Sequence, residues 1–119
     1  MMDISSSFAV IYRFYLQPSK EEKYVSHWKI VSNYFTKQRG AIASTLHKTE
    51  EGYWLAYSKW PDKKTRDASW QNEGIKSDLP EKIQKAIEVM KSCGDTQKES
   101  FPEICMAIIE QTDSNKRGV

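Results

Sequence analysis

The pattern of apolar and polar positions near the start of the chain predicts a strand followed by a helix. Phe8–Leu16 is rich in aromatic and β-branched residues, ends at a proline, and is apolar on both faces except at Arg13. The segment after it opens with Ser19-Lys20-Glu21-Glu22, the pattern of a capping box, and should form a helix to about Arg39. The apolar stripe of this helix, which we expect to face the core, consists of Tyr24, Trp28, Val31 and Phe35.

A β-hairpin is predicted next. Gly40 suits the C-cap of the helix, and Pro61 ends the second strand. Between them, residues 42–49 and 53–60 have strand composition, and Glu50-Glu51-Gly52 suits a three-residue loop with glycine at the position that needs a positive φ.

The length of the hairpin loop decides which side chains share a face of the sheet. A three-residue loop places His47 opposite Leu55 and on the same face as Tyr57. The other face then carries Trp54, Ala56 and Trp60. A four-residue loop would instead place His47 with Trp54.

Two further helices and a last strand are predicted after the hairpin. Asp62 can cap a short helix that runs to about Asn72. Another helix begins at Leu79-Pro80-Glu81 and ends at Cys93-Gly94. Its apolar side consists of Ile83, Ala86, Ile87 and Met90. The last strand is expected at Glu103–Gln111, with consecutive apolar residues from 104 to 109.

The order β-α-β-β-α-α-β predicts an α+β fold of the ferredoxin-like, split βαβ type, with one additional helix in the second crossover. Right-handed crossovers place the helices on one face of a four-stranded antiparallel sheet. The first and last strands are nevertheless apolar on both faces, which would leave a large apolar patch in water. We therefore expect a homodimer through the helix-free face that buries on the order of 1,500 Å².

Length and charge suggest one soluble domain over residues 1–119, with flexible ends at 1–7 and 112–119. The net charge of +2, with both signs interleaved, gives no reason to expect a nucleic-acid or membrane partner. No signal peptide or membrane span is recognisable, and the two cysteines lack CxxC spacing, so we expect a cytoplasmic protein with unpaired thiols. Export without a signal peptide stays open.

The segment from Arg39 to Pro61 has the pattern R-G-x-x-x-S-x-L-H-x-x-x-x-G-x-W-x-A-Y-x-x-W-P. This pattern, together with Pro18–Glu22 and Trp28, resembles the antibiotic biosynthesis monooxygenase family over about the first two-thirds of the chain. The resemblance implies a dimeric α+β barrel, with a ligand cavity between the helices and the sheet of each subunit. The region from Ser77 to Thr96 is less similar.

The resembled family contains cofactor-independent oxygenases of polyketide phenols, haem-degrading enzymes, and members without an established activity. Its oxygenases typically hold a phenolate with an asparagine, a tryptophan and further polar groups, and Trp60 could stand for the tryptophan. No asparagine occurs in the predicted strands. Haem-degrading relatives carry an asparagine on the first strand and a histidine after the second helix, and this chain has neither. Haem degradation by that route is therefore disfavoured.

These considerations select His47, Tyr57 and Trp60 as catalytic candidates, because an imidazole near neutral pKa can deprotonate or orient a phenol. An apolar cavity with a few polar tips holds planar aromatic ligands. The corresponding ligand-binding candidates are Tyr12, Arg13, Trp28, Trp54 and Trp70.

Structural alternatives exist for each candidate. His47 could be hydrogen-bonded at a sheet edge or dimer contact, Arg13 could pair with Glu103 or Glu110, and the aromatic residues could fill the core. No metal-ligand spacing occurs, and we expect neither a metal nor a cofactor. Two functions stay open: a cofactor-independent monooxygenase acting on a planar aromatic or polyketide-like molecule, and a non-catalytic binding or accessory dimer. Haem binding is a weaker third.

Overall fold

The computed structural model describes residues 7–69 and 78–112. The four strands are β1 (Phe8–Phe14), β2 (Ala43–Lys48), β3 (Trp54–Trp60) and β4 (Ile104–Ala107). The helices are α1 (Glu21–Gln38), α2 (Lys63–Ser69) and α3 (Glu81–Ser92), preceded by the 3₁₀ turn η2 (Pro18–Lys20). The predicted flexible ends lie outside the described residues except at residues 7 and 112.

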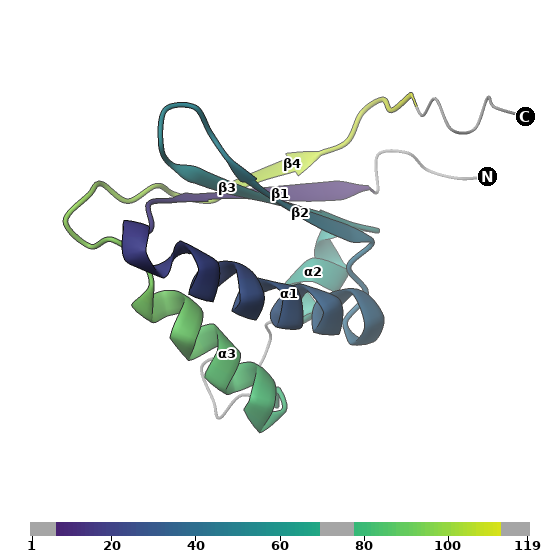
Figure 1. The fold of residues 1–119 in the computed structure, drawn as a ribbon. Coiled ribbons are helices and arrows are strands. Elements are labelled where there is room, and N and C mark those ends of the chain that lie inside the picture. Colours follow the sequence, from purple (N-terminus) through teal and green to yellow (C-terminus); the bar gives the residue numbers. More distant parts are fainter. Residues whose placement is uncertain (1–6, 70–77, 113–119) are drawn as a thin grey trace, which may run out of the picture.

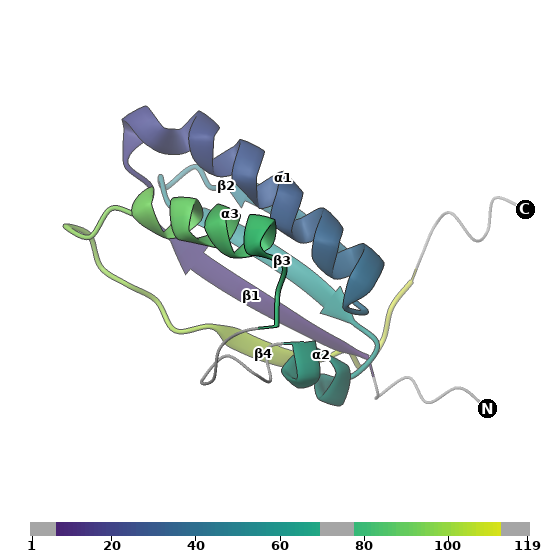
Figure 2. The ribbon, with the colours of Figure 1, turned by 90° about the horizontal axis from the view of Figure 1, so that it is seen from below.

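The four strands form one antiparallel sheet in the order β2-β3-β1-β4. This order, with helices in the crossovers, confirms the predicted α+β, ferredoxin-like arrangement. The long helices α1 and α3 lie side by side on one face of the sheet, and α2 lies near one end of it (Figures 1 and 2). No helix of the described residues lies on the opposite face (Figure 1).

The hairpin has the predicted register. His47 is opposite Leu55, and the backbone N–H of Thr49 donates to the carbonyl of Tyr53 at 2.8 Å, so the loop is the three-residue one. Gly52 has a φ of +105°, the conformation for which glycine was expected there. The four-residue alternative is thereby excluded.

The start of α1 differs from the prediction. Pro18 opens a 3₁₀ turn, in which the N–H of Lys20 donates to the carbonyl of Gln17 at 2.8 Å. Ser19 therefore lies inside this turn rather than ahead of the helix, and no side chain caps α1. The predicted capping box is wrong because proline fixes the first turn before the serine can act as the cap. The predicted core stripe of α1 is confirmed, with Trp28 only half-buried.

The two later helices start as predicted. The Asp62 carboxylate accepts a hydrogen bond from the N–H of Thr65 at 2.7 Å and so caps α2. The predicted end of this helix at Asn72 lies outside the described residues. Helix α3 buries Ile83 and Ala86, as its apolar pattern indicated.

The first and last strands are both shorter than predicted. After Phe14 the chain leaves the sheet and pairs with the segment after α3, through a bridge between Leu16 and Gly94. Strand β4 pairs with β1 only from Ile104 to Ala107, not over Glu103–Gln111. Strand β4 ends there because β1 begins at Phe8, so residues beyond Ile108 have no strand to pair with.

Strand alternation sorts the side chains onto two faces of the sheet. The helix-covered face carries the core, including Phe8, Val10 and Trp60, which pack with Val31 and Phe35 of α1. The helix-free face of this single chain is only partly covered, and its Ile104 is 37% exposed. The described residues of the single chain therefore do not cover the first and last strands on both faces.

Among the described residues, Cys93 is buried, Cys105 is exposed, and neither forms a disulfide. No helix in the described part of the chain is long and apolar enough to cross a lipid bilayer.

Candidate functional site

A cavity of about 790 Å³ lies between the helix-covered face of the sheet and the helices. This volume falls within the range of about 300–1,000 Å³ that is typical of sites for small organic ligands. The lining residues come from β1, β2, β3, α1, α2 and α3, and from Leu16, Gly94 and Glu103 outside these elements. The cavity is therefore where the predicted ligand site was expected, between helices and sheet.

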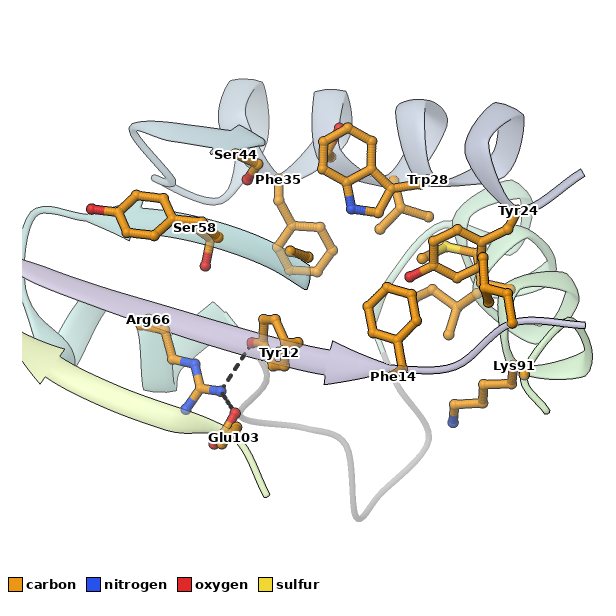
Figure 3. Close-up of a pocket in the computed structure, with 18 of the residues that line it drawn as sticks. Tyr12, Phe14, Tyr24, Trp28, Phe35, Ser44, Ser58, Arg66, Lys91 and Glu103 are labelled. Carbon is orange, nitrogen blue, oxygen red and sulfur yellow. Dashed lines mark hydrogen bonds and ion pairs between the residues drawn. The ribbon is translucent and has the colours of Figure 1, made fainter. Parts of the chain in front are cut away.

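The walls of the cavity are mostly apolar. Helix α1 contributes Tyr24, Trp28 and Phe35 (Figure 3). Helix α3 contributes Ile87 and Met90. These side chains recur at intervals of three, four or seven residues, which is the spacing that keeps one helix face on the cavity. Aromatic rings on several sides suit a flat apolar ligand.

One corner of the cavity is polar. Arg66 reaches it from α2, and its Nη2 donates to the Tyr12 hydroxyl at 3.1 Å and to the Glu103 carboxylate at 2.5 Å. Figure 3 shows these three side chains together, with Tyr24 and Lys91 farther along the cavity. We call Tyr12, Arg66 and Glu103 the polar corner.

Arg66 is the shielded member of the polar corner, whereas the Glu103 side chain is 39% exposed. The Arg66 side chain is only 14% exposed, and its Nε is buried without a hydrogen-bond partner among the described residues. Burial lowers the pKa of Arg66, but hydrogen bonds to Tyr12 and Glu103 outweigh burial and raise it overall. The guanidinium is therefore a permanent positive charge at the cavity wall.

Burial also raises the pKa of the Tyr12 phenol, and the hydrogen bond from Arg66 opposes this effect. Tyr12 is therefore protonated at neutral pH. The lining charges balance, because Arg66 and Lys91 are matched by Asp67 and Glu103. The cavity as a whole is thus neutral and suits a ligand with little net charge.

Four of the sequence-predicted residues line the cavity: Tyr12 on β1, Trp28 on α1, and Tyr57 and Trp60 on β3. Trp60 is only 3% exposed, and its Nε1 donates to the Ser58 hydroxyl at 3.0 Å. The indole N–H is therefore already satisfied by a neighbour on the same strand, and Trp60 contributes mainly ring surface.

The other two catalytic candidates do not join Trp60. His47 lies exposed on the helix-free face, where its Nε2 is 3.0 Å from the Thr45 hydroxyl. Tyr57 borders the cavity from β3, but strand alternation places its side chain on the face opposite to Ser58 and Trp60. The structure therefore separates His47 and Tyr57 from Trp60 across the thickness of the sheet.

Two of the remaining ligand-binding candidates, Arg13 and Trp54, also lie apart from the cavity. Arg13 projects to the helix-free face, where its guanidinium lies 4.7 Å from the ring centre of Phe101 and donates to the Pro102 carbonyl at 3.5 Å. It pairs with neither carboxylate proposed as its partner, because Glu103 binds Arg66. Trp54 is buried and borders a smaller groove beside β2. Trp70 lies outside the described residues.

Sequence reasoning missed Arg66 as a site residue. It stands in a short, charged stretch beside Lys63 and Lys64, which is the composition of a solvated helix face. Only the position of α2 at the end of the sheet turns Arg66 inward, and that position is a tertiary feature. Glu103 was noted in the sequence as a partner for the wrong arginine.

Among the described residues, no group of three or more histidine, cysteine, aspartate or glutamate side chains could hold a metal ion. Neither of the two histidines of the chain lines the cavity.

No protein-family model and no curated protein sequence matches the chain. Solved structures do. SnoaB, a cofactor-independent oxygenase from Streptomyces nogalater, superposes with a TM-score of 0.64 at 12% identity, over 90% of this chain and 96% of its own. A protein of Caulobacter crescentus, proposed to be an antibiotic biosynthesis monooxygenase, superposes with a TM-score of 0.67 at 13% identity. The superposition covers 90% of this chain and 93% of that protein.

A conserved protein from Methanosarcina mazei gives a TM-score of 0.66 at 14% identity, over 87% of this chain and 93% of its own. Likenesses at such low identity establish the fold. The chain has the fold of the antibiotic biosynthesis monooxygenases, as the sequence resemblance indicated.

Proposed function

We propose that the protein binds a planar aromatic or polyketide-like small molecule in the cavity and oxidises it as a cofactor-independent monooxygenase. The observation that carries this proposal is the cavity of about 790 Å³, which has aromatic and aliphatic walls and a single polar corner. The fold likeness to a cofactor-independent oxygenase supports the catalytic part.

The proposed reaction needs no external reductant when the substrate is an anthrone-like ketone. The ring methylene loses one proton to give an enolate, which passes electrons to dioxygen. One oxygen atom becomes the new carbonyl oxygen, and the other leaves as water with the two methylene hydrogens. The protein's part is to exclude bulk water, to hold the ring between Trp28 and Trp60, and to stabilise the oxygen that bears the enolate charge.

A second candidate function is binding without catalysis. The two carboxylates that line the cavity, Asp67 and Glu103, are both engaged in ion pairs with basic side chains. Among the described lining residues, no histidine is available to remove the substrate proton. A binding or accessory protein with the same cavity would need no such base.

Filling the cavity tests the proposal. Ser32 of α1 lines the cavity, and Ser32→Phe should lower both saturable binding of anthraquinone and oxygen uptake on anthrone by about tenfold or more, because the added ring occupies the ligand's space. Binding is measured by quenching of tryptophan fluorescence, and oxygen uptake with an electrode on metal-free protein.

Asn33→Phe is the matched control, because Asn33 is the next residue of α1 and is exposed. It should behave like the wild type in both assays. Binding without oxygen uptake in the wild type would select the non-catalytic function. Equal effects of the two substitutions, or no saturable binding at all, would reject the cavity as the ligand site.

We further propose that two copies associate through the helix-free face. Ile11, Leu55 and Met106 lie on this face by strand alternation, together with the exposed Ile104. The buried Nε of Arg13 also lacks a partner on this face among the described residues. A second subunit would cover the apolar side chains and supply polar contacts.

Sedimentation equilibrium should therefore give twice the 13.8 kDa chain mass for the wild type. Leu55→Asp should shift the protein to monomer, because it places a charge in the proposed interface. The matched control is Ile30→Asp on the outer side of α1, where Ile30 is 36% exposed, and it should remain dimeric. A monomeric wild type at micromolar concentration would contradict this proposal.

A further inference from the structure

The Tyr12 hydroxyl has an unused hydrogen. Its oxygen accepts the hydrogen bond from Arg66 Nη2 at 3.1 Å, so its own hydrogen must go elsewhere. Among the described residues, no acceptor for that hydrogen is found. A mostly buried donor without an acceptor is costly in an apolar setting, and a ligand oxygen in the cavity would satisfy it.

Three elements hold this hydroxyl in place. Tyr12 stands on β1, where it is paired with β3, Arg66 comes from α2, and Glu103 fixes the guanidinium from the segment before β4. Figure 3 shows the resulting chain of contacts at one side of the cavity. The positive charge on Arg66 draws electron density from the Tyr12 oxygen, which makes the O–H a stronger donor.

We propose that the Tyr12 hydroxyl donates a hydrogen bond to a ring carbonyl or hydroxyl oxygen of the bound aromatic ligand and stabilises the negative charge on that oxygen in the enolate or phenolate. Arg66 is a positioning residue that acts through Tyr12, and Glu103 holds Arg66 in place. This inference rests on the proposed function, because it assigns the polar contact made by the ligand in the same cavity.

A second tyrosine in the cavity provides a comparison. Tyr24 of α1 also lines the cavity, and its ring packs 5.1 Å from that of Phe14. Burial raises the pKa of both phenols, but only Tyr12 has a neighbouring guanidinium that opposes the rise. Tyr24 is therefore the weaker donor of the two, although it has the same chemistry and a similar apolar setting.

The charges around Tyr12 restrict the ligand. Glu103 already neutralises Arg66, and Asp67 adds a second carboxylate nearby. A ligand carboxylate would meet these two anions, whereas a ketone or a phenol would not. The polar corner therefore selects aromatic molecules that carry a keto or hydroxyl oxygen at one edge rather than an acid group.

The test uses 2-hydroxyanthraquinone, whose visible absorbance changes when its hydroxyl ionises, and unsubstituted anthraquinone as a probe of cavity binding alone. Burial raises the pKa of the bound hydroxyanthraquinone, and the hydrogen bond from Tyr12 should oppose this rise in the wild type. Tyr12→Phe should raise this bound pKa by about one unit, a tenfold loss of acidity, because a hydrogen bond to a charged oxygen is removed. Anthraquinone binding should change little.

Tyr24→Phe is the matched control and should leave the pKa of the bound probe unchanged. Arg66→Gln should raise it in the wild-type background but add little in the Tyr12→Phe background, which a role independent of Tyr12 would not produce. Circular dichroism and anthraquinone binding confirm that each variant keeps its fold and cavity.

The possible failures are distinguishable. If the wild type binds both probes and Tyr12→Phe leaves the pKa of the bound probe unchanged, or if Tyr24→Phe has the larger effect, the assignment of Tyr12 is overturned while the proposed binding function stands. If neither probe binds saturably, the proposed function and this inference are overturned together.

Discussion

Replacing Trp60 by alanine is expected to lower the free energy of unfolding by about 3–5 kcal/mol, the usual cost of deleting a buried aromatic side chain. Trp60 is 3% exposed and lies in the core cluster with Phe8, Val10 and Phe35. It stands directly opposite Phe8 in the pairing of β1 with β3, so its removal leaves a cavity in the core beside Phe8. Chemical denaturation with guanidinium chloride measures the change.

The matched control is Trp28→Ala. Trp28 is half-buried and borders the cavity, where one side of its ring already lacks protein contacts. Its removal should therefore cost clearly less, on the order of 1–2 kcal/mol. Equal losses for the two tryptophans would contradict the deeper packing of Trp60, which belongs to the core cluster as well as to the cavity lining.

Gly40→Ala is expected to cost about 2–3 kcal/mol, through backbone strain and a steric clash together. Gly40 ends α1 with a φ of +92°, and a Cβ there would lie 2.8 Å from Cγ2 of Thr65 at the start of α2. Gly52→Ala is the matched comparison, because Gly52 has a φ of +105° but open space around it. It should lose only about 1 kcal/mol, from strain alone.

Combining Gly40→Ala with Thr65→Ser separates the two contributions. Serine lacks the clashing methyl group but keeps the backbone N–H that Asp62 caps, so the double variant should recover most of the steric part of the loss. If Gly40→Ala and Gly52→Ala lower the free energy of unfolding equally, the proposed steric clash between residue 40 and Thr65 is contradicted.

The fold could be predicted because the turns and helix starts that define it are determined by a few neighbouring residues. Gly52 fixed the hairpin loop and therefore the register of β2 on β3, and Asp62 marked the start of α2. The prediction of a capping box was wrong for an equally local reason, because Pro18 begins a 3₁₀ turn one residue ahead of Ser19.

The site was predictable only in part. Alternation on the strands correctly placed His47 with Tyr57 and Trp54 with Trp60, but sequence alone did not reveal which of these faces the helices would cover. The charged partners depend on elements far apart in the chain: Arg66 and Glu103 are 37 residues apart and meet only in the folded sheet. No local sequence pattern predicts this ion pair between Arg66 and Glu103.

The length of β4 has a consequence for the charge of the cavity. Because pairing with β1 begins at Ile104, Glu103 is the residue that turns toward Arg66. Side chains alternate along a strand, so a shift of the last strand by one position would send this carboxylate to the other face and leave the guanidinium uncompensated. One inserted or deleted residue in the preceding loop could thus convert a pocket for uncharged rings into one for aromatic acids, which makes loop length a simple evolutionary control of ligand charge.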